Sequence, residues 1–435
     1  MTAPVTTAVP TAPGTPDTPG LADRGHIARL YREHLSSGRA VLGSVLGGML
    51  ETASDGAWVY TEDGRPYLDF GGYGVFILGH RHPAVTAAVH RQVDTHPLAG
   101  RVFLEPVAAR AAGALAARTP AGLDHVHFVN SGAEATEAGL KLARAHGHTA
   151  LVSTAGGYHG KTLGALTATA NPKYQQPFQP LLPDSTVVPY GDTDAMAAAL
   201  AGLGRRACVI VEPVQGEGGV RIPPPGYLAE VSRLCRTYGA FLIVDEIQTG
   251  LGRLGSWWGM EAEGAERAAP DVLLVGKGLS GGVVPVAAMV ATEAAYRPFS
   301  RDPYLHTSTF AASPIACAAA WAAVETLDRE DLVGRAQVLG DRLLTGVRAA
   351  CAPYSGGLVH EVRGRGLLIA LEFTEERTVG ELILELVGRG VVVNHSLNAT
   401  RVLRLTPPAI IGDEEVRLFL AALADGLRAV ATRVG

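Results

Sequence analysis

Lysine is scarce in this sequence, which draws attention to one of its lysines. The chain has four lysines, at positions 141, 161, 173 and 277, against 33 arginines. An arginine side chain keeps its charge at physiological pH, whereas a lysine amine can lose its proton and react. Lys277 follows a short apolar run that ends in Gly276, and more glycines come after it. A desolvated lysine in such a turn can form a Schiff base with a carbonyl compound, although a strand-end lysine that reaches water would look the same.

Cysteine and concentrated charge are lacking too. The four cysteines stand far apart in apolar or helical surroundings. The sequence therefore predicts buried thiols in a reducing compartment, and neither a disulfide framework nor a metal cluster. The formal net charge is −5, and there is no basic block and no acidic run. This balance excludes nucleic acid as the main partner.

Long apolar runs are missing as well. Residues 1–20 are rich in Thr, Pro and Ala and contain no Lys or Arg, which predicts a disordered tail and not a signal peptide. Pro285 and Pro314 interrupt the longest apolar stretches, so none reaches the roughly 18 residues that a membrane span needs. We expect a soluble cytoplasmic protein that associates with no membrane.

The sequence does contain a regular alternation of apolar runs and helical segments. Such alternation predicts an α/β fold with a mainly parallel, doubly wound sheet. Functional residues of these sheets collect at the carboxyl ends of the strands, where the loops converge. The runs that predict buried strands are 125–129, 149–154, 185–190, 207–214, 240–246 and 271–276.

The remaining segments predict a second, smaller domain. A hairpin is expected at 58–70, because Asp63 and Gly64 form a turn signal between two alternating runs. Beyond about residue 320 the pattern changes to long helices followed by strands and a final helix, which indicates an α+β domain. We divide the chain into an N-terminal segment that contributes to the small domain, a large cofactor-binding domain and a C-terminal small domain, at 21–85, 86–320 and 321–435.

The turn at 130–134 has the features of a phosphate site. Ser131 is followed three residues later by Glu134, which predicts a capping box at the start of a helix. The unpaired N–H groups and the dipole of a helix start both favour an anion. An ordinary helix cap would show the same pattern.

Asp245 ends the very apolar run at 240–246. An ionised carboxylate there is costly unless it has a cationic or hydrogen-bonding partner. A protonated pyridine nitrogen is such a partner, and an acidic residue opposite it keeps pyridoxal phosphate an electron sink. Gln248 could donate to the phenolic oxygen of the same cofactor. Asp245 and Glu246 could instead bind a metal, but no His or Cys stands at ligand spacing beside them.

Other polar candidates also follow predicted strands. Glu212 and Glu217 lie among glycines after the fourth run, in a segment that could equally be a surface turn. Tyr158 and His159 offer a ring that could stack on a cofactor or pack in the core. Arg404 lies on a late apolar strand ahead of two prolines, and a buried arginine needs a carboxylate from the protein or from a substrate.

The order and spacing of these motifs resemble a known family. The chain resembles the class III, or omega, aminotransferases of the fold-type I pyridoxal-phosphate enzymes in the motifs FVNSGAEATEAGLKLAR, GYHGKTLG, EPVQGEGG, LIVDEIQTGLGRLG, VGKGLSGG, HTSTF and RLTPP. The resemblance extends from about residue 25 to residue 430. Within the family the chain is most similar to putrescine aminotransferases, in the stretches GGYGVFILGHRHP, PLLP, IPPPGYL and DPYLHTSTF.

The resemblance implies pyridoxal 5'-phosphate as the cofactor. Lys277 would bind it covalently and later move protons, and Asp245 would pair with the pyridine nitrogen. Thr309 would reach the phosphate of the neighbouring subunit's cofactor, which implies a homodimer with shared sites. The residues assigned to the cofactor in this way are Ser131, Gly132, Ala133, Tyr158, His159, Glu212, Asp245, Gln248, Lys277 and Thr309.

The resemblance also implies a substrate side of the site. Arg404 would grip the carboxylate of a keto acid, and Glu217 would neutralise Arg404 when an amine without a carboxylate is bound. Tyr73 and Phe76, in the Gly-rich loop at 71–85, are further substrate candidates. The predicted reaction moves an amino group from a primary amine, such as the diamine putrescine, to 2-oxoglutarate or pyruvate and leaves an aldehyde.

Two departures from the family pattern concern the choice of amine. Ala311, Ala312 and Ser313 replace a frequent Gly-Gly-Asn, and Tyr158 stands where putrescine enzymes often have Phe. The same mechanism could therefore serve to aminate a pathway-derived aldehyde in natural-product biosynthesis. An aminomutase or racemase could use the same lysine, but a carboxylate grip at Arg404 favours transamination. A non-catalytic regulator is disfavoured by Lys277 and by the lack of a DNA-binding segment ahead of the fold.

Overall fold

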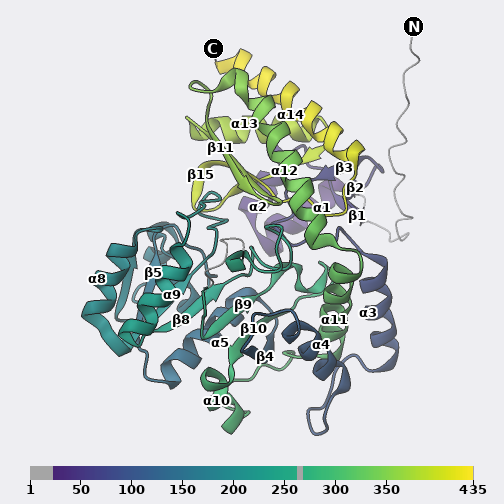
Figure 1. Ribbon diagram of the computed structural model, residues 1–435. Helices are drawn as coiled ribbons and strands as arrows, with labels where there is room; N and C mark the ends of the chain where they lie inside the picture. Colours follow the sequence, from purple (N-terminus) through teal and green to yellow (C-terminus); the bar gives the residue numbers. More distant parts are fainter. Residues whose placement is uncertain (1–22, 262–267, 435) are drawn as a thin grey trace.

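The computed structural model describes residues 23–261 and 268–434. The predicted disordered tail, 1–20, lies outside the described residues. Figure 1 shows a large sheet in the lower part of the molecule, with the N-terminal strands and a second small sheet above it. Most of the site residues named below lie on loops that follow strands of the large sheet, and Arg404 lies on a strand of that second small sheet.

The large sheet has seven strands in the order β4-β10-β9-β8-β7-β5-β6. Strands β5 to β9 run parallel, whereas β10 runs antiparallel to both of its neighbours, β4 and β9. Four strands, β5, β7, β8 and β9, are buried along their whole length, as expected where helices cover both faces of a sheet. The strands are β4 (Leu123–Val129), β5 (Ala150–Thr154), β6 (Ser185–Val188), β7 (Ala207–Val211), β8 (Phe241–Asp245), β9 (Val272–Val275) and β10 (Ala287–Thr292).

All six predicted strands are present, and the α/β fold class is confirmed. Strand β10 was not predicted from the sequence. It begins two residues after Pro285 and is rich in alanine, a residue with little preference for strands. Because β10 lies between β4 and β9, it makes the sheet mixed at this end.

Helices pack on this sheet, and most of them begin at a side-chain cap. Asp192, Glu105 and Thr292, for example, each accept a hydrogen bond from a backbone N–H of the first turn, as capping requires. Helix α11 packs against α3 and α4. The helices are α3 (Pro83–Thr95), α4 (Pro106–Ala116), α5 (Gly132–Ala145), α6 (Leu163–Ala168), α7 (Pro172–Gln175), α8 (Thr193–Leu203), α9 (Tyr227–Tyr238), α10 (Glu293–Arg301) and α11 (Pro314–Arg329).

Two four-stranded sheets complete the structure, in the orders β1-β2-β3-β13 and β11-β12-β15-β14. The second of them is antiparallel. Helices α12 (Leu332–Cys351), α13 (Glu376–Gly388) and α14 (Asp413–Val434) belong to the same part of the chain. The strands are β1 (Glu51–Asp55), β2 (Trp58–Thr61), β3 (Pro66–Asp69), β11 (Val359–Arg365), β12 (Leu368–Phe373), β13 (Val391–Val392), β14 (Asn394–Ser396) and β15 (Ala399–Leu405).

The first small sheet contains strands from the N-terminal part and from the C-terminal part of the sequence. The predicted hairpin is β2 and β3, with Gly64 at φ 76° in its turn. Strand β3 pairs in parallel with β13, so that Leu68 lies opposite Val391. Just beyond β3, the Thr406 hydroxyl donates to the Gly71 carbonyl oxygen at 2.9 Å. The Gly-rich loop that follows β3 is thereby tied to the segment that follows β15.

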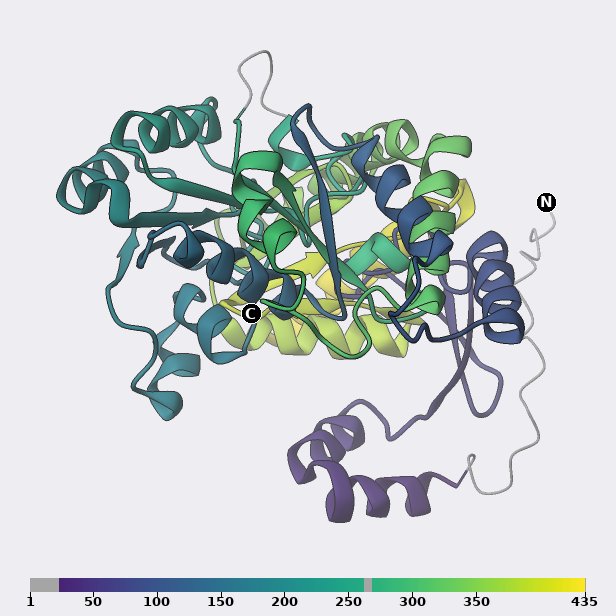
Figure 2. The same cartoon turned by 90° about the horizontal axis from the view of Figure 1, so that it is seen from below.

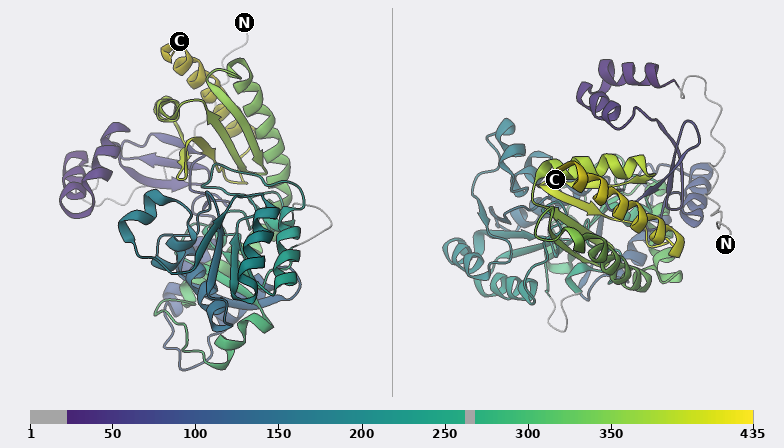
Figure 3. Two further views of the ribbon diagram at one scale, coloured as in Figure 1. Left: turned by 90° about the vertical axis from the view of Figure 1, so that its left-hand side faces the viewer. Right: turned by 90° about the horizontal axis from the view of Figure 1, so that it is seen from above.

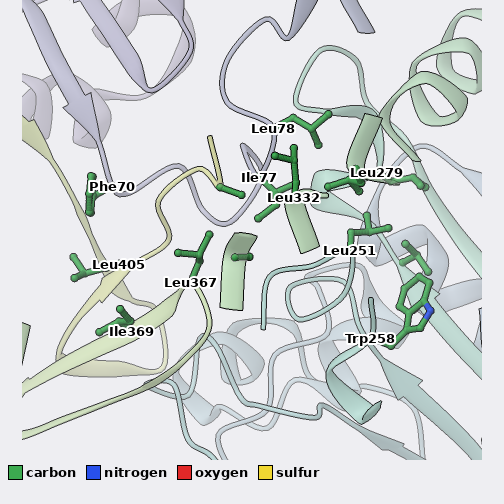
Figure 4. Close-up of a cluster of buried hydrophobic side chains, with 14 of the residues drawn as sticks. Phe70, Ile77, Leu78, Leu251, Trp258, Leu279, Leu332, Leu367, Ile369 and Leu405 are labelled. Atoms are coloured by element: carbon green, nitrogen blue, oxygen red, sulfur yellow. The ribbon is translucent and has the colours of Figure 1, made fainter. Parts of the chain in front are cut away.

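A shared apolar core connects these parts (Figure 4). The rings of Phe70 and Phe419 stack with centroids 4.0 Å apart. Fully burying one such large apolar side chain contributes about 1.5–3 kcal/mol. Because its side chains come from the N-terminal loop, the large-sheet loops and the C-terminal strands, the core fixes these loops relative to one another. The labelled members are Phe70, Ile77, Leu78, Leu251, Trp258, Leu279, Leu332, Leu367, Ile369 and Leu405.

The N-terminal arm, residues 24–45, stands away from the rest of the molecule (Figures 2 and 3). It consists of α1 (Arg24–Leu30), a π-helical segment (Tyr31–Leu35) and α2 (Ser37–Val45). Its apolar side chains are largely exposed, including Leu35 at 72% and Val41 at 62%. None of the described helices, here or elsewhere, has both the length and the apolar character that a bilayer crossing requires.

Candidate active site

Five of the predicted site residues stand at the carboxyl ends of strands in the large sheet. Ser131 follows β4, Tyr158 follows β5, Glu212 follows β7, Asp245 ends β8 and Lys277 follows β9. These strands all point the same way, because β4 and β9 are both antiparallel to β10 and the others are parallel to β9. Their carboxyl ends therefore meet along one edge, which is where α/β sheets bind ligands.

Lys277 is half-buried in a strained turn at this edge. It begins the 3₁₀ turn Lys277–Ser280 with φ 45°, and such backbone strain is typical of functional sites. Burial lowers the pKa of its amine to about 8, although the charge of Glu217 favours protonation. An appreciable share of the amine is therefore neutral near physiological pH, which is the form that attacks a carbonyl group.

Gln248 lies between Lys277 and Arg404. With its amide oxygen turned toward these two cations, it accepts from Lys277 Nζ at 3.1 Å and from Arg404 Nη1 at 3.3 Å. We assign this orientation because the opposite one would direct an N–H group at two donors. A larger residue at position 216 would displace Gln248, since a Cβ there would lie 1.7 Å from the Gln248 side chain. Donation from Gln248 to the phenolic oxygen of a cofactor stays a prediction.

Asp245 has a partner that the sequence did not identify. Its Oδ2 lies 2.7 Å from Nδ1 of the buried His159, and its Oδ1 accepts from the Ile247 N–H at 3.0 Å. His159 is itself held through its backbone N–H, which donates to the Thr169 hydroxyl at 2.9 Å. The predicted roles left His159 as a ring near the cofactor, whereas its position shows that it orients the Asp245 carboxylate.

The 130–134 turn starts α5 as predicted, with one difference in its capping. Ser131 Oγ accepts from the Glu134 N–H at 3.3 Å. The Glu134 carboxylate does not return to Ser131, as a capping box would have it, but accepts from the backbone N–H of Asn130 at 2.7 Å. Gly132 packs so closely that a Cβ there would lie 3.0 Å from Ile247. The first N–H groups of α5 lack acceptors within the helix, so this turn can bind an anion.

Within the described chain, the Thr309 side chain makes no hydrogen bond with these residues, but Thr309 lies next to Ser308, which contacts the 130–134 turn. Its side chain is exposed, on the loop between α10 and α11. Arg101 holds this loop by donating to the carbonyl oxygens of Thr309 at 3.0 Å and Ala311 at 2.7 Å. The neighbouring Ser308 accepts from Asn130 Nδ2 at 3.0 Å. An exposed threonine is consistent with a role in another subunit's site, and that role stays a prediction.

Glu217 and Arg404 form a buried ion pair. Arg404 lies on β15, and its Nη1 contacts Glu217 Oε1 while both side chains are almost fully buried. Burial alone would raise the pKa of Glu217, but the charges of Arg404 and Lys277 and the N–H of Leu397, 2.9 Å away, hold it below its usual value. Within the described chain, Nε and Nη2 of Arg404 find no hydrogen-bond partner. Two buried donors on a guanidinium can bind a carboxylate.

Glu212 and Tyr158 lie between the two sides of the site. Glu212 accepts from the Tyr158 N–H at 3.3 Å. Burial and the charge of Asp245 raise the pKa of Glu212 well above its ordinary value. A carboxyl group that stays protonated can donate a hydrogen bond. Tyr158 is half-buried, and Lys161 Nζ lies 6.0 Å from the centre of its ring.

Tyr73 and Phe76 occupy the Gly-rich loop after β3. Tyr73 has φ 51°, and its side chain is 47% exposed. Phe76 stacks on the ring of His80 with centroids 3.8 Å apart. His80 is in turn fixed by Asp69, 2.9 Å away. Both residues remain candidates for substrate contact, but Phe76 also supports its own loop.

Arg253 is a buried charged residue that the sequence analysis missed. Its Nη1 donates to the carbonyl oxygens of Leu367 at 3.2 Å and Pro407 at 2.5 Å. Burial, together with the nearby Arg404, lowers its pKa to about 9. The signal was available, because Arg253 interrupts a Gly- and Leu-rich stretch soon after Asp245. Its bonds join the loop after β8 to the loops that follow β11 and β15.

Fold and site together define a fold-type I transferase that depends on pyridoxal phosphate. The sequence profile described as "Aminotransferase class-III" matches residues 45–427. The chain therefore belongs to the class III aminotransferases, the family that its motifs resemble.

Solved structures of this family are similar over nearly the whole chain. An ornithine aminotransferase from Toxoplasma gondii is 32% identical with a TM-score of 0.87, and the match covers 95% of this chain and 96% of that one. An (S)-enantioselective omega-transaminase from Thermomicrobium roseum is 27% identical, with a TM-score of 0.83 and coverages of 94% and 99%. The ornithine delta-aminotransferase of Plasmodium falciparum is 29% identical, with a TM-score of 0.76 and coverages of 88% and 94%.

The residues of this chain fit the cofactor of the family. The amine of Lys277 lies close enough to Glu217 and Asp245 for the charges of these two carboxylates to act on it. His159 Nε2 and Gln215 Oε1 are buried polar atoms without a partner among the described residues. Such orphaned atoms are not expected in an apolar core, so this edge is built for a polar group. Within the described ranges, no cluster of three or more His, Cys, Asp or Glu could hold a metal ion.

Proposed function

We propose that the protein transfers the amino group of a primary amine, in particular a diamine such as putrescine, to a keto acid such as 2-oxoglutarate or pyruvate. The observation that carries the proposal is the buried pair of Glu217 and Arg404. A site that alternates between two such substrates needs a cation to bind the carboxylate of the keto acid. When the amine is bound, that cation needs a carboxylate of the protein to neutralise it. Arg404 would supply the cation, and Glu217 would supply the neutralising carboxylate.

The cofactor supplies an electron sink that weakens the bond between the substrate's α-carbon and its proton. In this chain, Lys277 Nζ would hold the cofactor and carry that proton, since its pKa of about 8 lets it act as base and acid. Asp245, oriented by His159, would face the pyridine nitrogen. The first N–H groups of α5, at 131–133, would bind the phosphate, and the half-buried Tyr158 would lie against the ring.

On the substrate side, Arg404 would bind the keto acid. Its Nη1 leaves Glu217 for the carboxylate, and the two unpaired donors, Nε and Nη2, become satisfied. With an amine in the site, the pair with Glu217 re-forms. Tyr73 and Phe76 would line the entrance, and their loop would help to select the amine.

We propose that the active form is a homodimer. The described residues expose a set of large apolar side chains at 98–104 and 304–310, which includes Val102 at 83%, Phe103 at 89% and Leu104 at 100%. A second copy of the chain would cover them. The second of these segments, 304–310, carries Thr309, which would then reach the phosphate site of the partner subunit. A cytoplasmic location is consistent with the four buried free cysteines.

A donor and acceptor screen tests the function. Purified protein would be mixed with putrescine, ornithine or another primary amine and with 2-oxoglutarate or pyruvate, and amino-acid product would be measured. We expect glutamate or alanine with putrescine. Ornithine belongs in the screen because the T. gondii neighbour is an ornithine aminotransferase, and both compounds carry a terminal amine. Isomerised amine without a keto-acid partner would show that the protein is an aminomutase or racemase instead.

The reverse direction is a second use of the same site. Supplying an aldehyde with glutamate or alanine and measuring new amine tests whether the physiological reaction aminates a pathway-derived aldehyde. This use is favoured by the departures at Tyr158 and 311–313, which change the walls near the amine.

A further inference from the structure

The turn between β14 and β15, residues 396–398, contacts the carboxylate oxygen of Glu217 that Arg404 Nη1 leaves free. The Leu397 N–H donates to Glu217 Oε2 at 2.9 Å. The Asn398 N–H donates to the Glu217 carbonyl oxygen, also at 2.9 Å. The Ser396 hydroxyl donates to the Gly216 carbonyl oxygen at 3.2 Å. One turn thus fixes both the backbone and the carboxylate of Glu217.

The side chain of Asn398 fixes this turn on the large-sheet loops. Its Nδ2 donates to the carbonyl oxygens of Gly156 and Gly157, both at 3.1 Å. Its Oδ1 accepts from Asn171 Nδ2 at 2.9 Å. Both N–H groups and the oxygen of the amide are therefore used, which no other amino acid of that size can match. Gly157 directly precedes Tyr158, so the same side chain also holds the loop that carries the aromatic ring.

The need for this arrangement follows from the exchange at Arg404. When Arg404 turns to a substrate carboxylate, Glu217 stays buried and loses its cationic partner. A buried carboxylate without a hydrogen bond is strongly disfavoured. The Leu397 N–H is independent of Arg404 and can remain on Glu217 Oε2, but only while the turn is held in place.

We propose that Asn398 is a positioning residue for the acceptor half of the reaction. It holds the Leu397 N–H against Glu217, so that Glu217 keeps a partner while Arg404 binds the carboxylate of the keto acid. The inference rests on the proposed function, because it needs Arg404 to alternate between Glu217 and substrate. Asn398 touches neither the reacting atoms nor Arg404, so it acts through Glu217.

The test uses Asn398→Ala in the protein carrying its cofactor. Glutarate, an unreactive dicarboxylate, would be titrated and its binding measured by calorimetry. We expect binding to weaken about 10-fold, the range for loss of one well-formed hydrogen-bonded contact to a charged group. The amine half-reaction, followed in single turnovers with putrescine or the amine that the donor screen identifies, should change by less than about 2-fold, because Glu217 and Arg404 remain paired there.

Two variants control the experiment. Tyr174→Phe removes a hydroxyl that donates to the Leu397 carbonyl oxygen at 3.2 Å, so it perturbs the same turn without touching Asn398 and should leave glutarate binding within about 2-fold. Asn398→Asp removes both donors and places an acceptor against the carbonyl oxygens of Gly156 and Gly157, so it should bind glutarate more weakly than Asn398→Ala does. If Asn398→Ala does not fold, Asn171→Ala removes one of the three bonds of the Asn398 amide, together with the side-chain cap of α7, and should give a smaller loss of the same kind.

The outcomes separate this inference from the proposed function. Arg404→Ala should abolish glutarate binding, and if it does not, the proposed carboxylate grip is wrong. If Arg404→Ala abolishes binding but Asn398→Ala binds glutarate like the unaltered protein, only the positioning role is overturned. Equal losses in glutarate binding and in the amine half-reaction would overturn it too, because they would show general loosening of the fold.

Discussion

The cofactor side and the substrate side of the site are built in different ways. On the cofactor side, Asp245 and Lys277 each stand at the end of their own strand in one sheet, and β8 pairs directly with β9. On the substrate side, Glu217 comes from a loop of the large sheet and Arg404 from β15 of a separate small sheet. The first is fixed by hydrogen-bonded strand pairs within one sheet, and the second by an ion pair and hydrogen bonds between two separate parts of the chain.

Because of this difference, we expect the residues of the two sides to differ in how far they can move. A residue held by its own strand cannot shift without breaking the sheet, which suits chemistry that is the same for every substrate. A pair held across two sheets can open while each sheet stays intact, which suits the binding of two unlike substrates. The expected effects of substitutions should follow this division.

Loss of Lys277 should have the largest effect. We expect Lys277→Ala to lower kcat by about 10⁵-fold, as removal of a covalent catalytic group commonly does, and to abolish the visible absorbance of bound cofactor. Lys173→Ala, at an exposed lysine, is the matched control and should keep both. A colourless unaltered protein after incubation with pyridoxal phosphate would contradict the assignment of the cofactor.

Loss of the Asp245 charge should come next. Asp245→Asn keeps the shape and the bond from the Ile247 N–H but removes the charge, so we expect it to fold and to lose about 10³-fold in kcat, the scale of a buried electrostatic contribution. His159→Ala removes one of the two contacts to Asp245 and should cost about 10-fold. A larger loss of kcat in His159→Ala than in Asp245→Asn, measured in the steady state, would show that the carboxylate faces something other than the pyridine nitrogen.

On the substrate side, the expected loss is confined to one substrate. Arg404→Ala should raise KM for 2-oxoglutarate about 100-fold, as expected when a buried charge-assisted contact is removed, and leave the amine half-reaction nearly unchanged. It should also destabilise the protein by about 3–5 kcal/mol in thermal unfolding, because Glu217 is left buried without its cation. Adding Glu217→Gln should restore most of that stability without restoring KM. If Arg404→Ala impaired the amine half-reaction as much as the reaction with 2-oxoglutarate, the proposed division into a cofactor side and a substrate side would be wrong.

The smallest effect expected is on the pH at which the cofactor is taken up. Only the neutral amine of Lys277 reacts, and its pKa is about 8, so the rate of recombination with cofactor-free protein should rise about 10-fold between pH 7 and pH 9 and then level off. Because the charge of Glu217 stabilises the protonated amine, Glu217→Gln should move this rise to lower pH. Rapid mixing followed by absorbance would measure it, and an unchanged midpoint would show that the two sides are electrostatically independent.

The cofactor side was predictable from the sequence, and the reason is local. Asp245 and Lys277 stand directly after apolar runs of strand length, so the run itself predicts both the strand and the position of the residue at its end. The helix start at Ser131 has its own signature four residues long. Once the strands are taken as parallel, these residues must lie along one edge.

The features that the sequence did not predict arise mainly from contacts between segments that are distant in the sequence. Nothing near Asp245 in the sequence indicates that His159 orients it, or that the Leu397 N–H reaches Glu217. Tyr73 and Phe76 were chosen for their glycine-rich surroundings, but the stacking of Phe76 on His80 could not be read from spacing. Strand β10 was missed because its alanines carry almost no strand signal, although it is the partner of both β4 and β9.

The pairing of β3 with β13 has a consequence for the order in which a newly synthesised chain can fold. Strand β3 is made early, but one of its two neighbours, β13, begins at Val391, so the first small sheet cannot be completed before that segment has left the ribosome. Domains generally fold as units during synthesis. The large sheet, complete at Thr292, can form while the ribosome is still adding the segment that contains Asn398 and Arg404. The cofactor side can thus form first, and Arg404 joins Glu217 only after the strands of the large sheet have been made.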